Sequence, residues 1–256
     1  MYDFAALAAA GLGVGVVVGL TGVGAGAVMT PLLIAGFGVP VPVAVGTDLA
    51  CAAISKTAGT LAHRAAHNVV TRVVVLLAFG SVPAAVATLV FIAVAEPSTA
   101  TLAHVMRSGI AILLIASIAM LLLRTRAVRS RRASTATWRW RAGATIGVGA
   151  VMGCAVALTS LGAGAIGAAC IAFLHPELDA RQIAGSDIAH AVPLTLVAAA
   201  GHAWLGTIDW SLLLALAMGA VPGIVVGSLL TRAVPADALR YLLIATLAFA
   251  AFKLLA

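Results

Sequence analysis

The chain has 256 residues, of which 63% are hydrophobic and only 9% are charged, and its formal net charge is +7. Soluble domains carry about 25% charged and about 45–50% apolar residues, because a globule of this size needs a polar surface. The composition therefore excludes an ordinary soluble protein and places the chain among integral membrane proteins.

Long apolar segments follow one another along the chain, and most are close to the roughly 20 residues that a helix needs to cross a bilayer. Two shorter apolar pieces, 25–37 and 163–174, follow the first and fifth of these spans, and we interpret them as half-helices or re-entrant segments. We therefore expect an all-α, polytopic membrane protein with about eight transmembrane helices, and ten crossings stay open as an alternative. The eight spans cover residues 4–22, 43–63, 70–95, 102–123, 142–160, 183–203, 210–231 and 238–255.

Arginine is concentrated between the fourth and fifth spans, where no acidic residue occurs. This pattern predicts a cytoplasmic loop under the positive-inside rule, with anionic lipid headgroups as a compatible contact and no nucleic-acid partner. Counting eight spans from this loop places both termini in the cytoplasm of a multi-pass cell-membrane protein, although Arg181 and Arg232 then fall on the outer side. The basic run contains Arg124, Arg126, Arg129, Arg131, Arg132, Arg139 and Arg141.

The two halves of the chain match each other at a nearly constant offset. The segment TGVGAGA at 21–27 aligns with TSLGAGA at 159–165, and VGTDLA at 45–50 aligns with AGSDIA at 184–189. We interpret this as a duplication, with a first transmembrane repeat at 1–123, the basic loop at 124–141 and a second repeat at 142–256. Four spans per repeat would give parallel halves, whereas five would give inverted halves. Scarce residues also align, namely His63 with His202, Gly80 with Gly219, and Pro83 with Pro222.

Glycine-rich breaks interrupt the apolar run at matching places in the two halves. A helix that restarts after such a break points free N–H groups and the positive end of its dipole toward the gap. In transporters, such interrupted helices form substrate sites near the bilayer midplane, although small residues also serve tight helix packing. The break residues that we select as candidate anion contacts are Thr21, Gly24 and Gly26, with Thr159, Gly162 and Gly164.

Asp48, Lys56 and Asp187 lie inside predicted spans, and charges in hydrocarbon are costly enough to mark functional positions. Asp48 and Asp187 occupy equivalent places, and Lys56 follows Asp48 by eight residues, which is about 12 Å along a helix. Lys56 is our leading candidate for contact with an anionic substrate; the alternative is a structural ion pair with a carboxylate on another helix. The aspartates could carry protons for coupling or could shape the gaps by capping helices.

Other polar residues recur beside these positions. Thr47 and Ser186 precede the two aspartates and join the candidate substrate contacts. His63 and His202 sit at matching span ends, and His190 lies one turn after Asp187, with which it could share a hydrogen bond. The sequence shows no metal-ligand spacing, no cofactor motif and no duplicated nucleophile–base pair, so we expect neither a metal site, a cofactor nor an enzyme.

The motifs resemble those of the TauE/SafE-type sulfite exporters, also called TSUP transporters, over nearly the whole chain. Ala25 and Ala163 depart from the family pattern, which often has glycine there. The resemblance implies a plasma-membrane carrier, with family members linked to sulfite, sulfonates and related organosulfur compounds. The motifs are GLTGVGAG at 19–26, PLL at 31–33 and VGTDL at 45–49 with Lys56 and His63, then GSDIAHA at 185–191, GH at 201–202 and VPGI at 221–224.

Together these features predict a secondary transporter of small anions, with export of sulfite or a sulfonate as the leading hypothesis. A passive anion channel and a non-transporting membrane subunit stay open as alternatives, as does assembly into a homo-oligomer. The expected partners are a small anionic substrate and the lipid bilayer. Export of an anion from a cell with a negative interior gains about 2.3 kcal/mol per charge per 100 mV, so it needs no coupling ion in principle.

Overall fold

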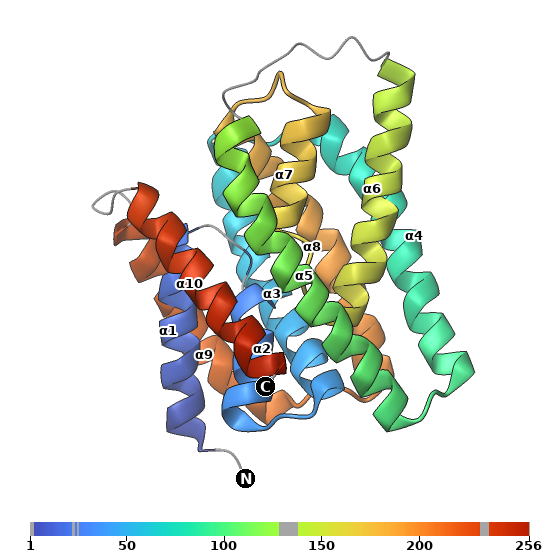
Figure 1. Ribbon diagram of the computed structural model, residues 1–256, viewed down its shortest axis with the longest axis vertical. Coiled ribbons are helices and arrows are strands. Elements are labelled where there is room, and N and C mark those ends of the chain that lie inside the picture. The colour runs from blue at the N-terminus through green and yellow to red at the C-terminus, as the bar shows by residue number, and fades with distance from the viewer. Residues whose placement is uncertain (1–2, 22–23, 25, 128–137, 231–235, 256) are drawn as a thin grey trace.

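The computed structural model describes residues 3–21, 24, 26–127, 138–230 and 236–255, and these residues form ten helices and no strand (Figure 1). The long helices coincide within a few residues with the predicted spans, and two short helices lie where half-helices were predicted, so the all-α polytopic fold is confirmed. In chain order the helices are α1 (Phe4–Thr21), α2 (Gly26–Phe37), α3 (Val41–Ala65), α4 (Thr71–Ala95), α5 (Thr99–Ala127), α6 (Trp138–Thr159), α7 (Ala165–Leu174), α8 (Ala180–Trp204), α9 (Trp210–Leu230) and α10 (Ala236–Leu255).

Length and composition separate the helices into two kinds. Within the described residues α1, α4, α5, α6, α8 and α9 are long and apolar enough to cross a membrane. Helix α3 has the same 25 residues as α4 and α8, but it carries Asp48 and Lys56 in its interior. A helix with such residues is stable in a membrane only when its polar face is covered by protein, and this explains its central position.

The helices of the first half pack mainly on helices of the second half. Helix α1 lies along α9, α4 lies along α6, and α3 crosses α8 at the centre (Figure 1). Helix α2 contacts α10, and α5 contacts α7. Exchanging α1–α5 for α6–α10 in order interchanges the α1–α9 and α4–α6 pairs and the α2–α10 and α5–α7 pairs, and it returns the α3–α8 pair to itself. The contacts are therefore those that a two-fold relation between the halves would produce, and the main interface runs through α3 and α8.

Close backbone contacts fix the direction of the paired helices. A Cβ atom added to Gly11 would meet the backbone of Leu216, and one added to Gly19 would meet Ile224 and Ser228, so α1 and α9 run parallel. Small residues at such seams allow helix backbones to approach, which is the usual mode of helix association in lipid. Similar contacts of Gly149 with Leu77 and of Gly153 with Ser81 make α4 and α6 parallel.

The short helices reverse the chain and make the two halves inverted. Gly46 near the start of α3 lies against Thr207, just before α9, and α9 begins beside the start of α1. The chain therefore runs away from this end of the molecule along α1 and returns to it along α2. With five helices in each half, α6 starts at the end opposite to α1 (Figure 1).

This topology bears on the predicted orientation. The start of α1 and the end of α10 point to one end of the bundle, whereas the end of α5 and the start of α6, which flank the basic loop, lie at the other (Figure 1). This is the arrangement of the ten-crossing alternative, in which the loop and the termini lie on opposite sides. The eight-span count placed them on one side because it took α2 and α7 as re-entrant segments, and each of them adds a reversal. Which end faces the cytoplasm stays a prediction. Residues 128–137 of the loop lie outside the described part of the chain.

The corrected topology also gives a more consistent charge distribution. Arg181 contradicted the predicted scheme, yet it begins α8 at the same end as the flanks of the basic loop, together with Arg64, Arg72 and Arg141. Arg232 lies outside the described residues. The opposite end carries Asp3, Glu96 and Asp209, with Lys253 and, two turns into α5, Arg107 as exceptions. From the positive-inside rule we now expect the arginine-rich end to face the cytoplasm and both termini to face outward.

Reporter fusions can test this orientation. We expect alkaline phosphatase fused after Ala256 to be active in a bacterial host and green fluorescent protein at the same site to be dark, because the arginine-rich end is retained inside. The same reporters fused within the basic loop should show the reverse. A fluorescent, phosphatase-negative fusion at Ala256 would contradict the orientation.

Candidate functional site

The two predicted glycine breaks meet inside the bundle. A Cβ atom added to Gly24 would lie 2.7 Å from the Ala163 carbonyl oxygen and 3.6 Å from Lys56 Nζ. A Cβ added to Gly26 would collide with the backbone and hydroxyl of Ser160. The breaks thus cross backbone against backbone, and the ammonium group of Lys56 lies beside the crossing. A larger residue at either glycine would push the two halves apart.

The second break reverses the chain by means of left-handed backbone conformations. Helix α6 ends at Thr159, and Ser160, Gly162 and Gly164 have φ values of 61°, 124° and 136°. Thr159 Oγ1 accepts a hydrogen bond from the Leu161 N–H at 3.1 Å and donates to the Ala155 carbonyl at 2.6 Å. Thr159 therefore holds the end of α6, and glycine at 162 and 164 permits conformations that side chains rarely adopt.

Only part of the first break can be compared with the second. Gly22, Val23 and Ala25 lie outside the described residues. Thr21 Oγ1 donates to the Val17 carbonyl at 2.7 Å, which is the same bond to the preceding helical turn that Thr159 makes. The two predicted threonines therefore bond to their own helices.

Asp48 joins α2, α3 and the second break. Its side chain is fully buried, and Oδ2 accepts hydrogen bonds from Thr30 Oγ1 at 2.6 Å and Ser160 Oγ at 2.7 Å. The other oxygen, Oδ1, is buried and finds no hydrogen-bond partner among the described residues. A buried carboxylate oxygen without a donor is unfavourable, so half of this group is unsatisfied in the observed state.

The side chain of Asp187, a residue of α8, lies at the beginning of α7. Its carboxylate accepts a hydrogen bond from the backbone N–H of Gly164, the residue that precedes α7, and it is only 4% exposed. A Cβ added to Gly167 would collide with Asp187 Oδ1, which has no hydrogen-bond partner. The positive end of α7 was predicted to receive a substrate oxyanion, and in the structure a carboxylate of the protein holds that place.

Lys56 lies between the two aspartates without pairing directly with either. Its charge interacts with both Asp48 and Asp187, but no nitrogen–oxygen pair of Lys56 within 4.0 Å occurs among the described residues. The alternative reading of Lys56 as a direct structural ion pair is therefore not what the described part of the chain shows. Two carboxylates and one ammonium group leave the ionised cluster with one net negative charge.

Thr47 and Ser186 make equivalent contacts away from the crossing of the breaks. Thr47 Oγ1 accepts from the backbone N–H of Asp209 at 3.1 Å, next to the start of α9. Ser186 Oγ accepts from the N–H of Val70 at 3.0 Å, next to the start of α4. Each hydroxyl thus fixes the beginning of a helix in the other half. These contacts support a structural role for two residues that were predicted to bind substrate.

The three histidines predicted for the site differ in how many of their ring nitrogens form hydrogen bonds with the described residues. Both ring nitrogens of His202 are hydrogen-bonded, to Thr207 Oγ1 at 2.7 Å and to the Ala157 carbonyl at 2.9 Å. His190 Nε2 bonds to Ser81 Oγ at 2.8 Å, and its Nδ1 has no partner. The predicted hydrogen bond between His190 and Asp187 is therefore wrong. His63 lies near the arginine-rich end of α3, half-buried, and its Nδ1 has no partner.

Sequence reasoning missed two residues that define the site. Thr30 stands in the apolar segment of α2, where a buried hydroxyl needs a partner and so could have been flagged. Ser160 was quoted only for the repeat, although its place in the break next to Thr159 was visible. Gly167 carried no signal, because its importance arises only from the approach of Asp187.

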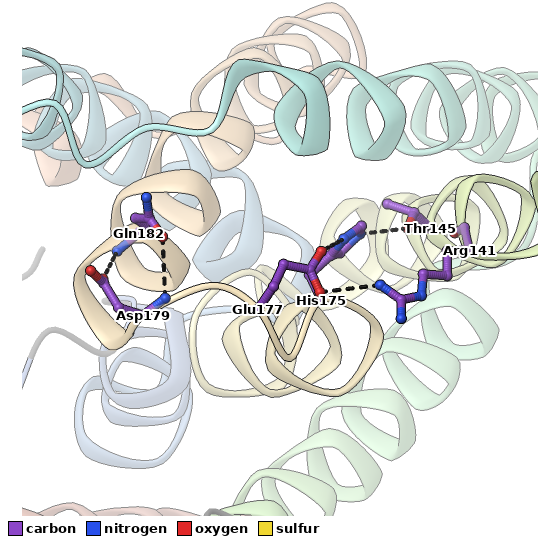
Figure 2. A network of polar contacts seen from close by, with 6 residues as sticks. All are labelled: Arg141, Thr145, His175, Glu177, Asp179 and Gln182. Carbon is purple, nitrogen blue, oxygen red and sulfur yellow. Dashed lines mark hydrogen bonds and ion pairs between the residues drawn. The ribbon is translucent and has the colours of Figure 1, made fainter. Parts of the chain in front are cut away.

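A second polar network lies at the arginine-rich end and connects α6 with the segment between α7 and α8 (Figure 2). Arg141 pairs with Glu177 at 3.1 Å, while His175 bonds to Glu177 and to Thr145. Partial burial alone would raise the pKa of Glu177, but hydrogen bonds from the backbone and His175 and the charge of Arg141 hold it below its usual value. Asp179 and Gln182 form a capping box at the start of α8.

Comparisons with known proteins agree with this architecture. The family described as "Sulfite exporter TauE/SafE" matches residues 7–254. A protein of Bacillus subtilis (strain 168), described as "Probable membrane transporter protein YjnA", is 34% identical over 232 residues, which cover 89% of this chain and 90% of the relative. No solved structure matches the chain.

The contact between Gly167 and Asp187 gives a stability prediction. We expect Gly167→Ala to lower the free energy of unfolding by about 1–3 kcal/mol, because the new methyl group displaces the buried carboxylate. The matched control is Gly147→Ala in α6, where an added Cβ meets nothing within 4 Å. The control should be neutral or stabilising by up to about 1 kcal/mol, because alanine favours helix. Thermal unfolding in detergent measures both, and equal effects would contradict the contact.

Proposed function

The chain belongs to the sulfite exporter TauE/SafE family and is a membrane transporter, and from this premise we propose that it is a secondary transporter that exports a small oxyanion, sulfite or a sulfonate. The observation that carries the proposal is the position of Lys56. Its ammonium nitrogen lies beside Gly24, where the two breaks cross at the interface between the inverted halves. Transporters with inverted repeats bind their substrates at this kind of position.

Lys56 supplies the attraction for an anion at this position. A positive charge in a medium of low dielectric constant attracts an anion far more strongly than it does in water. The side chain makes no direct ion pair with Asp48 or Asp187 among the described residues, so substrate does not have to displace a bonded carboxylate. Because no carboxylate oxygen of the described residues lies within 4.0 Å of Lys56 Nζ, the ammonium hydrogens are available to the oxygens of an oxyanion.

Asp187 limits where the substrate can sit. The carboxylate occupies the beginning of α7 and would repel a second anion there. We therefore place the oxyanion between Lys56 and the glycine backbone of the first break. Protonation or displacement of Asp187 would open the start of α7 as a second contact, and this gives Asp187 a coupling role, which is one of the two roles considered for it from the sequence.

The close packing of α1 on α9 and of α4 on α6 suggests how the site becomes accessible from one side of the membrane and then from the other. Helices α1 and α9 approach through glycine contacts along their length, as do α4 and α6. We propose that each seam moves as a rigid unit, while the contacts across α3 and α8 open alternately toward the two sides. Exchange of equivalent conformations between inverted halves produces alternating access in other secondary transporters. Outward movement of the anion gains free energy from a membrane potential that is negative inside.

The two lysines of the chain make a matched test. Purified protein in proteoliposomes is assayed with sulfite, thiosulfate, sulfate, sulfoacetate and taurine under an imposed membrane potential. We expect saturable flux of one of these solutes, lowered more than about tenfold in Lys56→Met, because a charge-assisted contact contributes about 1.5–3 kcal/mol. Lys253→Met should keep the full flux, because Lys253 is exposed near the end of α10.

The other outcomes discriminate among the alternatives. Flux that rises linearly with concentration would identify a passive anion channel instead of a carrier. No flux of any solute under any gradient, from protein that unfolds cooperatively, would favour a non-transporting membrane subunit. Equal loss in both lysine variants would remove the special role of Lys56.

A further inference from the structure

We propose that Asp48, Thr30 and Ser160, together with the carboxyl-terminal end of α6, form a binding site for one monovalent metal cation, Na⁺. The site is separate from the proposed anion position beside Gly24, and it stands on its own geometry. Only its coupling to anion transport rests on the proposed function.

Oxygen atoms of three chain segments converge at Asp48. Thr30 Oγ1 and Ser160 Oγ lie 2.6 and 2.7 Å from Asp48 Oδ2, in a region where all three residues are buried. Asp48 Oδ1 is buried and has no hydrogen-bond partner within the described part of the chain. Carboxylate, hydroxyl and carbonyl oxygens are the ligands that hard cations prefer. An ion held by Oδ1 and the hydroxyl lone pairs would satisfy the group that the protein leaves unpaired.

The end of α6 adds the negative end of a helix dipole. The last turn of a helix has carbonyl groups without donors from the same helix, and they carry partial negative charge. Helix α6 ends at Thr159, and the carbonyl of Ser160 faces the bare backbone of Gly26. Asp48 therefore contacts the end of α6, which favours cations, through Ser160, and the second turn of α2 through Thr30. Asp187 lies at the start of α7, which favours anions.

Charge balance indicates a single positive charge. Ionised Asp48, Asp187 and Lys56 leave one net negative charge in the interior, which is unfavourable in a membrane. One monovalent cation neutralises it. A divalent ion would leave an excess positive charge, and the described residues contain no group of three or more His, Cys, Asp or Glu side chains that could hold a metal ion.

The site occurs in only one half of the molecule. At the repeat offset of 138 residues, Thr30 corresponds to Ala168, and Ser160 corresponds to Gly22. Asp187 therefore lacks the two hydroxyl companions of Asp48 and bonds to the Gly164 amide instead. Hydroxyls that are present around one aspartate and missing around its counterpart indicate a role that duplication of the fold alone does not require.

A proton fits the same place less well. A proton on Oδ1 would need an acceptor, and this atom makes no hydrogen bond with any of the described residues. A cation instead contacts several oxygens at once. In the transport cycle, Na⁺ at Asp48 would cancel the excess negative charge and so favour entry of the anion beside Lys56.

Ion-dependent stability of the purified protein tests the site without any transported anion. Thermal unfolding is followed in detergent at constant chloride concentration and pH, with NaCl, KCl or choline chloride. We expect NaCl to raise the Tm by roughly 2–8 °C over choline, because a ligand that binds only the folded state stabilises it. Equal Tm values in NaCl and choline chloride would overturn the proposal.

Variants locate the effect. Thr30→Val and Ser160→Gly should abolish the Na⁺-dependent shift; the glycine removes the hydroxyl while suiting the φ of 61°. Ser117→Ala should keep it, because that buried hydroxyl only bonds to Leu113 within α5. A full shift in Thr30→Val and Ser160→Gly would place the ion elsewhere and overturn the site.

A second measurement covers the case in which the variants fold poorly. Binding of radioactive ²²Na⁺ to the wild-type protein should be competed by unlabelled Na⁺ and not by choline. Stabilisation by acid with no specific ²²Na⁺ binding would identify a proton at Asp48 and reject the metal ion. Specific Na⁺ binding without flux of any tested anion would support the site and count against the transport function alone.

Discussion

The structure is organised around a few charges that are removed from water in the interior of a membrane protein. Asp48, Lys56 and Asp187 lie on the two central helices, and burial of such groups in hydrocarbon is unfavourable by several kcal/mol each. The fold offsets this cost because α3 and α8 lie at the interface of the halves and because a helix end points toward each aspartate. Hydroxyl groups reach Asp48, a backbone amide reaches Asp187, and neither group is fully satisfied. Groups that are left partly unpaired at high cost are the natural places for exchangeable ions and substrates.

Glycine makes this arrangement possible in two physical ways. At Gly24 and Gly26 the missing side chain allows one broken segment to cross the other at backbone distance, which brings Lys56 to the crossing. At Gly162 and Gly164 it allows the left-handed conformations that reverse the chain between α6 and α7. The long seams between helices also depend on small residues. The same residue type thus builds both the rigid units and the gap between them.

The inverted relation of the halves changes the meaning of the charge pattern. When α2 and α7 are counted as reversals of the chain, the arginines that flank the basic loop and Arg181 fall at one end, and the termini fall at the other. The network of Arg141, His175 and Glu177 then lies at the arginine-rich end, where it ties α6 to the segment after α7 (Figure 2). The two aspartates occupy equivalent positions, and their surroundings differ because Thr30 and Ser160, which bond to Asp48, correspond to Ala168 and Gly22 in the other half.

The sequence by itself determined the membrane class, the long spans, the short helices after the breaks and the family, because hydrophobic length and local glycine and polar patterns are properties of neighbouring residues. It also indicated Lys56, Asp48 and Asp187, since charges within apolar runs are conspicuous. Only the tertiary structure decided the direction of the short helices, and with it that the termini lie at the end of the bundle opposite to the flanks of the basic loop. It also decided that Thr47, Ser186 and His202 form structural hydrogen bonds, that Asp187 fills the start of α7, and that Thr30 and Ser160 gather around Asp48. These facts depend on contacts between residues more than a hundred positions apart or on different helices, and no local pattern encodes which of two buried polar groups will meet.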